Sequence, residues 1–406
     1  MTKRLKKQAK PVVFLGLVIG CALIVSGVLG LSGHLNNQEA IKSKKKNQVS
    51  ETKTNSSSQN KSDPKMPKMP KMTLEQKVGQ LFMTGMPANN YDQATFDAIE
   101  KYQVGSIILT GRSNLSIPEM KVITDKLQGL APANRRLLIS CDQEGGNVQV
   151  LQGAGFSEMP NGLTQGSWAP EKLQEEAKNW GSELSAAGIN FDLAPVADQV
   201  LSADFAPQNA PIGYWSRQYA YDKANIVSHA DAFSKGMKSA GVLTTAKHFP
   251  GLGAVTGNTD ISAGVRDGQT NPKSESVQIF KELISSGVPS IMTATAIYDQ
   301  IDLELPGAFS PKMVDGLLRN QLDFDGLVIT DDLSNAVQVQ AWSPGQRAVL
   351  ALAAGNDLVL ANEPTQIPEM ISEVLQKAKS DQGFAEKINQ ASSRVMKVKE
   401  QMKLVE

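Results

Sequence analysis

The stretch LLRNQLDFDGLVITDDLS, residues 317–334, decides both the fold and the site. Its first half has the apolar spacing of an amphipathic helix end, Gly326 marks a turn, and Leu327 to Ile329 form a short apolar run. Such a run is typical of a parallel strand that is covered on both faces. The triplet Thr330 to Asp332 follows where this strand would leave the core. Adjacent carboxylates repel each other, so two acids here predict a functional strand end unless backbone amides or a basic side chain compensate them.

Similar apolar runs recur along residues 73–406, with helical periods between them. The strand candidates are Gln80 to Gly85, Gly105 to Thr110, Leu137 to Asp142, Ile189 to Pro195, Leu243 to His248, Ser290 to Ala296, Gly326 to Asp331 and Asp357 to Ala361. The clearest helical periods are Pro170 to Ala187, Tyr221 to Ala240, Ser276 to Ser286 and Pro344 to Ala354. Thr73 and Gln76 predict a capping box that begins the folded part.

Eight alternations of strand and helix predict a single (β/α)8 barrel, a TIM-like α/β fold. A doubly wound open sheet is the alternative. The barrel is favoured because polar residues recur at the carboxyl end of nearly every strand, and no glycine-rich dinucleotide fingerprint follows the first strand.

The strand ends carry the groups expected of an active site. They include CDQEGG at residues 141–146, the segment Asp192 to Asp198, KHFPGLG at residues 247–253 with Asn258 to Asp260 beyond it, and Asp331 with Asp332. A rim of acids, a lysine, a histidine and glycine-rich loops suits a polyhydroxylated ligand, whose hydroxyl groups need charged donors and acceptors.

Each of these residues also has a structural interpretation. His248 alone would be a core histidine, but an interior lysine beside it, Lys247, requires a polar cleft or an acidic partner. Asp142 is either a ligand-binding residue or the cap of the next helix. Tyr214 and Trp215 are expected to pack rather than to stack on a sugar.

Composition excludes several classes of protein. With 41 basic and 41 acidic residues among 406, nothing favours electrostatic binding to nucleic acid. The cysteines are Cys21 and Cys141, so an outer domain contains no internal disulfide and no cysteine metal site. The three histidines are widely separated, and no metal-binding motif is present. We therefore expect no metal and no cofactor.

The N-terminal segment predicts a membrane anchor. Residues 1–10 form a basic tail, residues 11–33 an uncharged apolar run that is long enough to span a bilayer, and residues 34–72 a polar, disordered linker. The basic tail favours a cytoplasmic N-terminus, which would place the domain of residues 73–406 outside the cell. Cleavage before Cys21, giving a lipoprotein, is the alternative.

Taken together, the motifs resemble glycoside hydrolase family 3, in particular its single-barrel bacterial β-N-acetylhexosaminidases. The resemblance extends from Thr73 to the C-terminus. Its motifs are LEQKVGQLF at Leu74, CDQEGG at Cys141, FDLAPVAD at Phe191, KHFPG at Lys247, GLVITDDLS at Gly326 and AGNDLVL at Ala354. It implies a monomeric retaining glycosidase that acts on a carbohydrate or peptidoglycan-derived glycan.

The resemblance also implies roles for individual residues. The aspartate after the threonine of the strand-seven motif is the family's nucleophile, which makes Asp331 the nucleophile here. Positions that bind sugar in the family match Asp142, Lys247 and His248, and Arg217 in SRQYAYD is a further match.

Two departures from the family matter. Its enzymes carry an Asp-Ser-His triplet after the lysine-histidine motif, and the histidine is the general acid/base. Here Asp260 takes the place of that histidine and Asn258 that of its aspartate partner. The arginine that usually follows CDQEGG is Asn147, which bears on recognition of muropeptide-type substrates.

Retaining glycosidases need a nucleophilic carboxylate and a proton donor on opposite sides of the anomeric carbon. We expect Asp260, on a mobile loop, to be the donor, with Glu144 as the reserve. The predicted function is an extracellular, membrane-anchored retaining glycosidase that cleaves a β-linked N-acetylglucosaminide or β-glucoside. The alternative is a non-catalytic cell-wall glycan-binding protein derived from the same barrel.

Overall fold

The computed structural model describes residues 71–405, and their strands form a closed parallel barrel. The strands are β1 Phe82–Pro87, β2 Ser106–Thr110, β3 Leu138–Cys141, β6 Phe191–Asp192, β7 Leu243–Thr244, β8 Ala246–Phe249, β10 Ser290–Thr293, β12 Leu327–Thr330 and β13 Val359–Ala361. Six of them are paired in the order β13-β1-β2-β3-β6-β7, and three in the order β12-β10-β8. Because β7 and β8 are two parts of one strand interrupted at Thr245, they join the two sets.

The ring closes between β12 and β13, where the Thr330 N–H donates to the Leu358 carbonyl at 3.0 Å. All eight predicted strands are therefore present, and the predicted barrel is confirmed.

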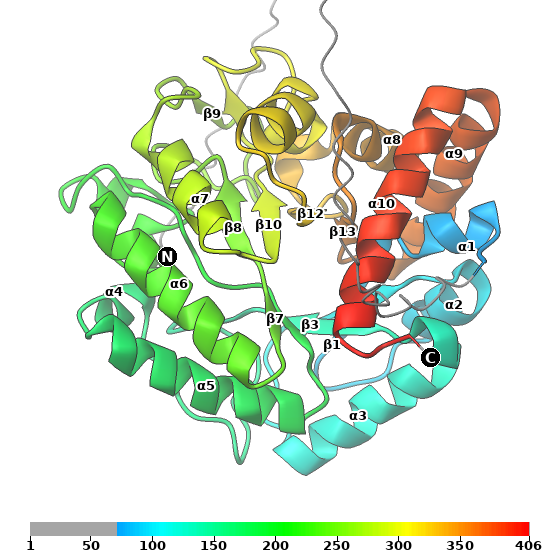
Figure 1. The fold of residues 1–406 in the computed structure, drawn as a ribbon, viewed down its shortest axis with the longest axis horizontal. Helices are drawn as coiled ribbons and strands as arrows, with labels where there is room; N and C mark the ends of the chain where they lie inside the picture. The colour runs from blue at the N-terminus through cyan, green and yellow to red at the C-terminus, as the bar shows by residue number, and fades with distance from the viewer. Residues whose placement is uncertain (1–70, 406) are drawn as a thin grey trace, which may run out of the picture. The chain divides into compact units, whose positions relative to one another are not determined.

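A helix follows each strand, and Figure 1 shows these helices arranged around the strands. They are α2 Gln93–Tyr102, α3 Ile117–Leu130, α5 Pro170–Ala186, α6 Lys223–Ser239, α7 Glu275–Ser285, the π-helix η5 Lys312–Gln321, α8 Pro344–Ala354 and α9 Ile367–Ser380. Two further helices, α1 Leu74–Gly79 and α10 Gln382–Gln401, stand outside this repeat. The capping box predicted at Thr73 and Gln76 begins α1.

Short elements occupy the connections between strands and helices. They are β4 Gln143–Gly145, β5 Val148–Gln149, β9 Arg266–Asp267, β11 Ile297–Tyr298, α4 Gly162–Gln165 and the 3-10 turns η1 Ala133–Arg135, η2 Ala206–Gln208, η3 Gly213–Trp215, η4 Gly307–Phe309, η6 Val337–Val339 and η7 Pro364–Gln366. Several of them carry the site.

The stretch of residues 317–334 has the predicted order of helix, turn and strand, with one difference. The helix end belongs to a π-helix, η5, which buries Leu317 and Leu318. A Cβ atom at Gly326 would lie 2.8 Å from the Pro289 carbonyl oxygen, so glycine fits this turn. All of β12 is buried, and its alternate residues belong to two different apolar clusters. The strand is thus covered on both faces, as its sequence predicts.

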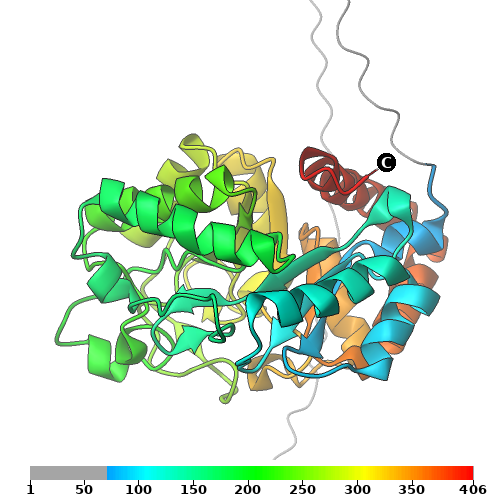
Figure 2. The ribbon, with the colours of Figure 1, turned by 90° about the horizontal axis from the view of Figure 1, so that it is seen from below.

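Helix α10 packs at the end of the barrel that is opposite to the polar strand ends. Figures 1 and 2, which are at right angles, both show it outside the strands at this end. Lys399 of this helix is fully buried, and its Nζ donates to Gln80 Oε1 at 2.6 Å and to the Gly105 carbonyl at 2.7 Å. Burial, and to a lesser extent the charge of Arg135, lowers the pKa of Lys399 from 10.5 to about 7.

This buried lysine predicts an unusual pH dependence of stability. Between pH 7 and about 10 the unfolded chain binds more protons than the folded one, so the free energy of unfolding rises with pH. The gain reaches about 2 kcal/mol between pH 7 and pH 9. The variant Lys399→Met should lose this rise. Urea unfolding of both proteins at the two pH values measures it, and equal pH dependence in the two proteins would contradict the assignment.

The predicted basic tail, membrane segment and linker, residues 1–72, lie outside the described residues except for their last two positions. Within residues 71–405, no helix is both long enough and apolar enough to cross a membrane.

Candidate active site

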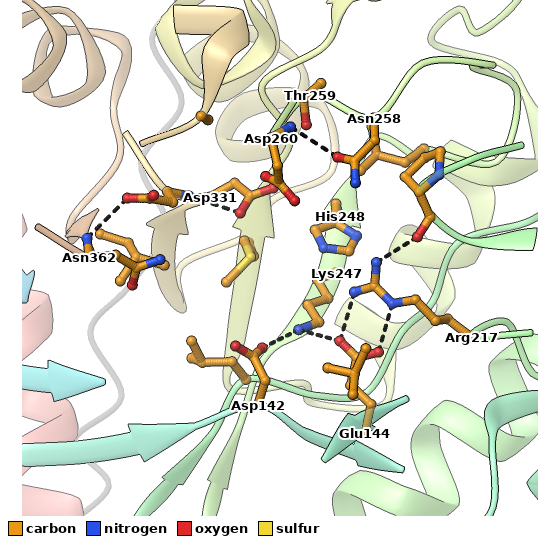
Figure 3. Close-up of a pocket in the computed structure, with 18 of the residues that line it drawn as sticks. Asp142, Glu144, Arg217, Lys247, His248, Asn258, Thr259, Asp260, Asp331 and Asn362 are labelled. Atoms are coloured by element: carbon orange, nitrogen blue, oxygen red, sulfur yellow. Dashed lines mark hydrogen bonds and ion pairs between the residues drawn. The ribbon is translucent and has the colours of Figure 1, made fainter. Parts of the chain in front are cut away.

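A polar cavity of about 550 Å³ opens at the carboxyl ends of the strands (Figure 3). All six residues predicted for the site line it: Asp142, Arg217, Lys247, His248, Asp260 and Asp331. They come from β3, the β6–α6 connection, β8 and its following loop, and the end of β12. The structure thus brings together residues that are up to 189 positions apart in the sequence, from 142 to 331.

Lys247 and Arg217 form one ion-pair network with two acids. Lys247 Nζ lies 2.6 Å from Asp142 Oδ1 and 2.6 Å from Glu144 Oε1. The Arg217 guanidinium binds both Glu144 oxygens at 2.8 Å, which is the strong bidentate arrangement. Asp142 is therefore paired with a lysine, and it caps no helix.

The network fixes the charge of Glu144. Burial opposes its ionisation, but Arg217 and Lys247 together lower the pKa of Glu144 to about 2. Asp142 and Glu144 in turn raise the pKa of the buried Lys247, against the effect of burial. Glu144 is a poor proton donor in this arrangement, because two cations hold it as a carboxylate. This geometry speaks against its reserve role as the acid.

His248 is held by an aspartate that the sequence analysis did not assign. Its Nδ1 lies 2.7 Å from Asp198 Oδ2, while Asp198 Oδ1 accepts the Leu252 N–H at 2.7 Å. A carboxylate at Nδ1 orients the ring and leaves Nε2 for a ligand. His248 lines the cavity, as Figure 3 shows, and is thus more than a core residue. Asp198 ends the motif FDLAPVAD, and this motif is the signal from which its role could have been found.

The two adjacent acids after β12 differ sharply in their partners. Both Asp332 oxygens are occupied: Oδ1 accepts the N–H groups of Ser334 and Asn362 at 2.9 and 3.0 Å, and Oδ2 accepts the Asn335 N–H at 3.0 Å. Asp331 Oδ1 accepts the Asp332 N–H at 2.8 Å, and among the described residues Oδ2 has no hydrogen-bond partner. Backbone amides thus compensate Asp332, whereas Asp331 keeps one oxygen for chemistry.

Asp260 faces Asp331 across the top of the cavity. In Figure 3 its carboxyl group points toward that of Asp331. The residue as a whole is exposed, but its carboxyl group is turned into the cavity. Limited hydration there, and then the charge of Asp331, raise the pKa of Asp260 from 3.8 to about 6. A carboxyl group with a raised pKa beside an ionised one is the pattern of a general acid and its partner.

Hydrogen bonds hold the loop that carries Asp260. The Val337 and Gln338 N–H groups donate to the carbonyls of Asp260 and Thr259, both at 3.1 Å. The Gln338 side chain bonds the Val265 N–H at 2.9 Å and its carbonyl at 3.1 Å. The loop expected to be mobile is thus fastened to η6, which follows the strand of Asp331. Asn258 Oδ1 accepts the Asp260 N–H at 2.9 Å and does not orient its carboxyl group.

Three further residues line the cavity, of which the sequence analysis missed Asn362 and expected Trp215 to pack. Asn362, at the end of β13, has a buried Oδ1 without a hydrogen-bond partner among residues 71–405. Trp215, expected to pack, is 44% exposed and lines the cavity. Asn147, at the place of the family's arginine, also lines it, and its carbonyl accepts from Arg112. A single sequence gave no signal that separates such lining residues from surface residues.

Comparisons with known proteins agree with this barrel. Residues 73–398 match the model of the glycosyl hydrolase family 3 N-terminal domain. The chain therefore belongs to glycoside hydrolase family 3, and it is a glycosidase.

The similar proteins found include β-hexosaminidases and β-N-acetylglucosaminidases of this family. A β-N-acetylhexosaminidase from Beutenbergia cavernae DSM 12333 is 48% identical, with a TM-score of 0.80 over 81% of this chain and 99% of that one. A β-hexosaminidase from Hydrogenovibrio crunogenus is 32% identical over 316 residues, which are 74% of this chain and 85% of that protein. A family 3 β-N-acetylglucosaminidase from Paenibacillus sp. FPU-7 is 29% identical, with a TM-score of 0.75 over 82% of this chain and 63% of that one. The resemblance inferred from the motifs is confirmed.

Proposed function

We propose that this protein is a retaining β-glycosidase in which Asp331 is the nucleophile and Asp260 the general acid/base. The observation that carries the proposal is the unpaired Asp331 oxygen, which faces the Asp260 carboxyl group of raised pKa in one polar cavity. Retaining glycosidases use two carboxyl groups in these roles.

The proposed reaction has two steps. In the first, Asp331 Oδ2 attacks the anomeric carbon while protonated Asp260 gives its proton to the departing glycosidic oxygen, which leaves as an alcohol. In the second, Asp260 takes a proton from water, the water oxygen attacks the anomeric carbon, and the bond to Asp331 breaks. Both carboxyl groups then return to their starting states.

The remaining cavity groups suit the recognition of sugar hydroxyl groups. Asp142 accepts hydrogen bonds, Lys247 and Arg217 donate them, and Asp198 fixes the ring of His248. The names of the relatives make a terminal N-acetylhexosamine the first candidate sugar. A β-glucoside is the second. Glycans of the cell wall are the proposed natural source.

Trapping of the glycosyl-enzyme tests this proposal. A panel of 2-deoxy-2-fluoro and 5-fluoro glycosides slows the second step, and mass spectrometry of the digested protein then locates the sugar. We expect one labelled peptide that contains Asp331, and the glycoside that reacts identifies the sugar. A label on another residue would move the nucleophile.

The second candidate function is non-catalytic binding of glycan, which is favoured by the absence of the family's acid/base histidine at position 260. Activated aryl glycosides discriminate between the two functions, since their leaving groups need little protonation. Turnover with a trapped intermediate supports the enzyme. Tight binding without turnover or label supports the binding protein.

We also propose that the enzyme acts outside the cell, held by the predicted membrane segment of residues 11–33, with a lipid on Cys21 as the alternative. A chain that starts at Lys71 keeps the complete capping box of α1. We expect this fragment to be soluble and as active as the full chain, measured by kcat/KM and by sedimentation. Aggregation of the fragment alone would show that the linker packs on the barrel.

A further inference from the structure

The cavity that contains Asp260 is also lined by an aromatic side chain that the proposed mechanism does not use. Trp215 is 44% exposed, although a large aromatic side chain favours burial. It lines the catalytic cavity together with Pro211 and Arg217, which come from the same connection between β6 and α6. Its neighbour Tyr214 packs against it edge to face, with 4.9 Å between the ring centroids.

Trp215 lies on a firmly held turn. The Trp215 N–H donates to the Ile212 carbonyl at 3.2 Å within the 3-10 turn η3. Fully buried Asn209 supports this turn, because its Oδ1 accepts the Gly213 N–H at 2.7 Å. An exposed aromatic side chain on a rigid turn is pre-organised for stacking, since little conformational entropy is lost when a ligand binds.

The same asparagine connects this turn to the loop of the proton donor. Asn209 Nδ2 donates to the carbonyls of Leu252 and Val255, at 2.8 and 2.7 Å. Both residues belong to the segment between β8 and Asp260. These hydrogen bonds connect the turn of Trp215 to the loop that carries Asp260, the proposed proton donor to the leaving group.

We propose that Trp215 is the platform for the sugar on the leaving-group side of the scissile bond. This inference rests on the proposed function. The sugar is a pyranose whose C–H face lies on the indole ring, continuous with the cavity that holds the terminal sugar. Exposed apolar residues adjoin Asp260 in the chain and through a hydrogen bond: Ile261, its neighbour in sequence, is 76% exposed, and Val337, whose N–H donates to the Asp260 carbonyl, is 39% exposed. The site therefore prefers a glycan substrate with a second sugar over one with a small leaving group.

Two substrates with the same terminal sugar test the proposal, a β-linked disaccharide and a glycosyl fluoride. The fluoride has no second ring, so it does not reach Trp215. The variant Trp215→Ala should lose about tenfold or more in kcat/KM on the disaccharide and stay within about twofold on the fluoride. Trp215→Phe should retain most of the disaccharide activity. Tyr91→Ala is the matched control, since Tyr91 is an aromatic residue that is 41% exposed, does not line the cavity and packs against Phe96 rather than Trp215.

A second measurement isolates binding of the second sugar from cleavage. Enzyme trapped with a fluoro glycoside is reactivated when an acceptor sugar attacks the anomeric carbon, giving a transfer product and free Asp331. We expect the rate to saturate with acceptor for the wild type and to rise only linearly for Trp215→Ala. Equal losses on both substrates, or no loss on either, would overturn the platform.

The experiment also distinguishes failure of the proposed glycosidase function from failure of the proposed sugar-stacking role of Trp215. If the wild-type protein turns over neither substrate, the glycosidase function is contradicted, and sugar binding measured by calorimetry then tests the role of Trp215. Trp215→Ala must in that case weaken the binding of the disaccharide about tenfold relative to the monosaccharide. Equal weakening for the two sugars would overturn the platform as well.

Discussion

Replacing Asp331 by asparagine should lower kcat about a thousandfold or more, because an amide oxygen is too weak a nucleophile to form the glycosyl-enzyme. The fold should be unchanged, since the asparagine Oδ1 still accepts the Asp332 N–H. Steady-state kinetics on an aryl glycoside measures the activity, and thermal unfolding measures the fold.

The neighbouring acid provides the matched comparison. Asp332→Asn replaces a carboxylate that accepts the N–H groups of Ser334, Asn335 and Asn362, so this variant should lower Tm as well as activity. Residual activity above a few per cent in Asp331→Asn would shift the nucleophile, most naturally to Asp332.

The loss of activity on replacing Asp260 by alanine should depend on the leaving group of the substrate. Substrates with poor leaving groups should lose about 10²- to 10⁴-fold in kcat/KM, the usual contribution of general acid catalysis. Activated aryl glycosides should keep the first step nearly intact. Added azide should then accelerate the second step and give a glycosyl azide, because a small anion needs no general base. Equal losses on both substrates without rescue would make Asp260 a loop or binding residue.

The pH profile gives an independent reading of the same residue. A general acid works in its protonated form, and the pKa of Asp260 is raised to about 6. The first step should therefore be fast below pH 6 and decline as the pH rises through 6, by about tenfold for each further unit. Measuring kcat/KM against pH for wild type and Asp260→Ala checks this. On substrates with poor leaving groups the residual activity of the variant should lack this decline, and a decline that persists in the variant would assign it to another group.

The barrel and its rim followed from local features of the sequence. Strand β12 is recognisable because a strand buried on both faces must be apolar throughout. The two acids after β12 are recognisable as candidate functional residues because adjacent carboxylates at the end of a buried strand repel each other. The roles within the pair Asp331 and Asp332 did not follow from residue type. They depend on the N–H groups of Ser334, Asn335 and Asn362, and Asn362 lies 30 positions from Asp332, directly after strand β13.

Other features depend on long-range geometry in the same way. The ion pairs of Glu144 with Arg217 and Lys247 join residues that are far apart in the sequence, so nothing near Glu144 in the chain indicates that it stays ionised. The place of Trp215 at the cavity depends on the turn that Asn209 supports, and no feature next to Trp215 in the sequence indicates this support. The π-helical form of η5 did not follow from the sequence either, because the apolar spacing of residues 317–322 predicts a helix end but not the type of helix.

The attachment of the Asp260 loop to η6 has a consequence for how such enzymes diverge. Its hydrogen bonds from Val337 and Gln338 go to backbone carbonyls, so the position of residue 260 is set without any contribution from its side chain. A scaffold of this kind allows the proton-donating group to be exchanged by a single substitution, with no rebuilding of the chain around it. The histidine that the family resemblance implies at this position and the aspartate that we propose as the acid would then be alternative side chains on the same backbone position, each with its own working pH.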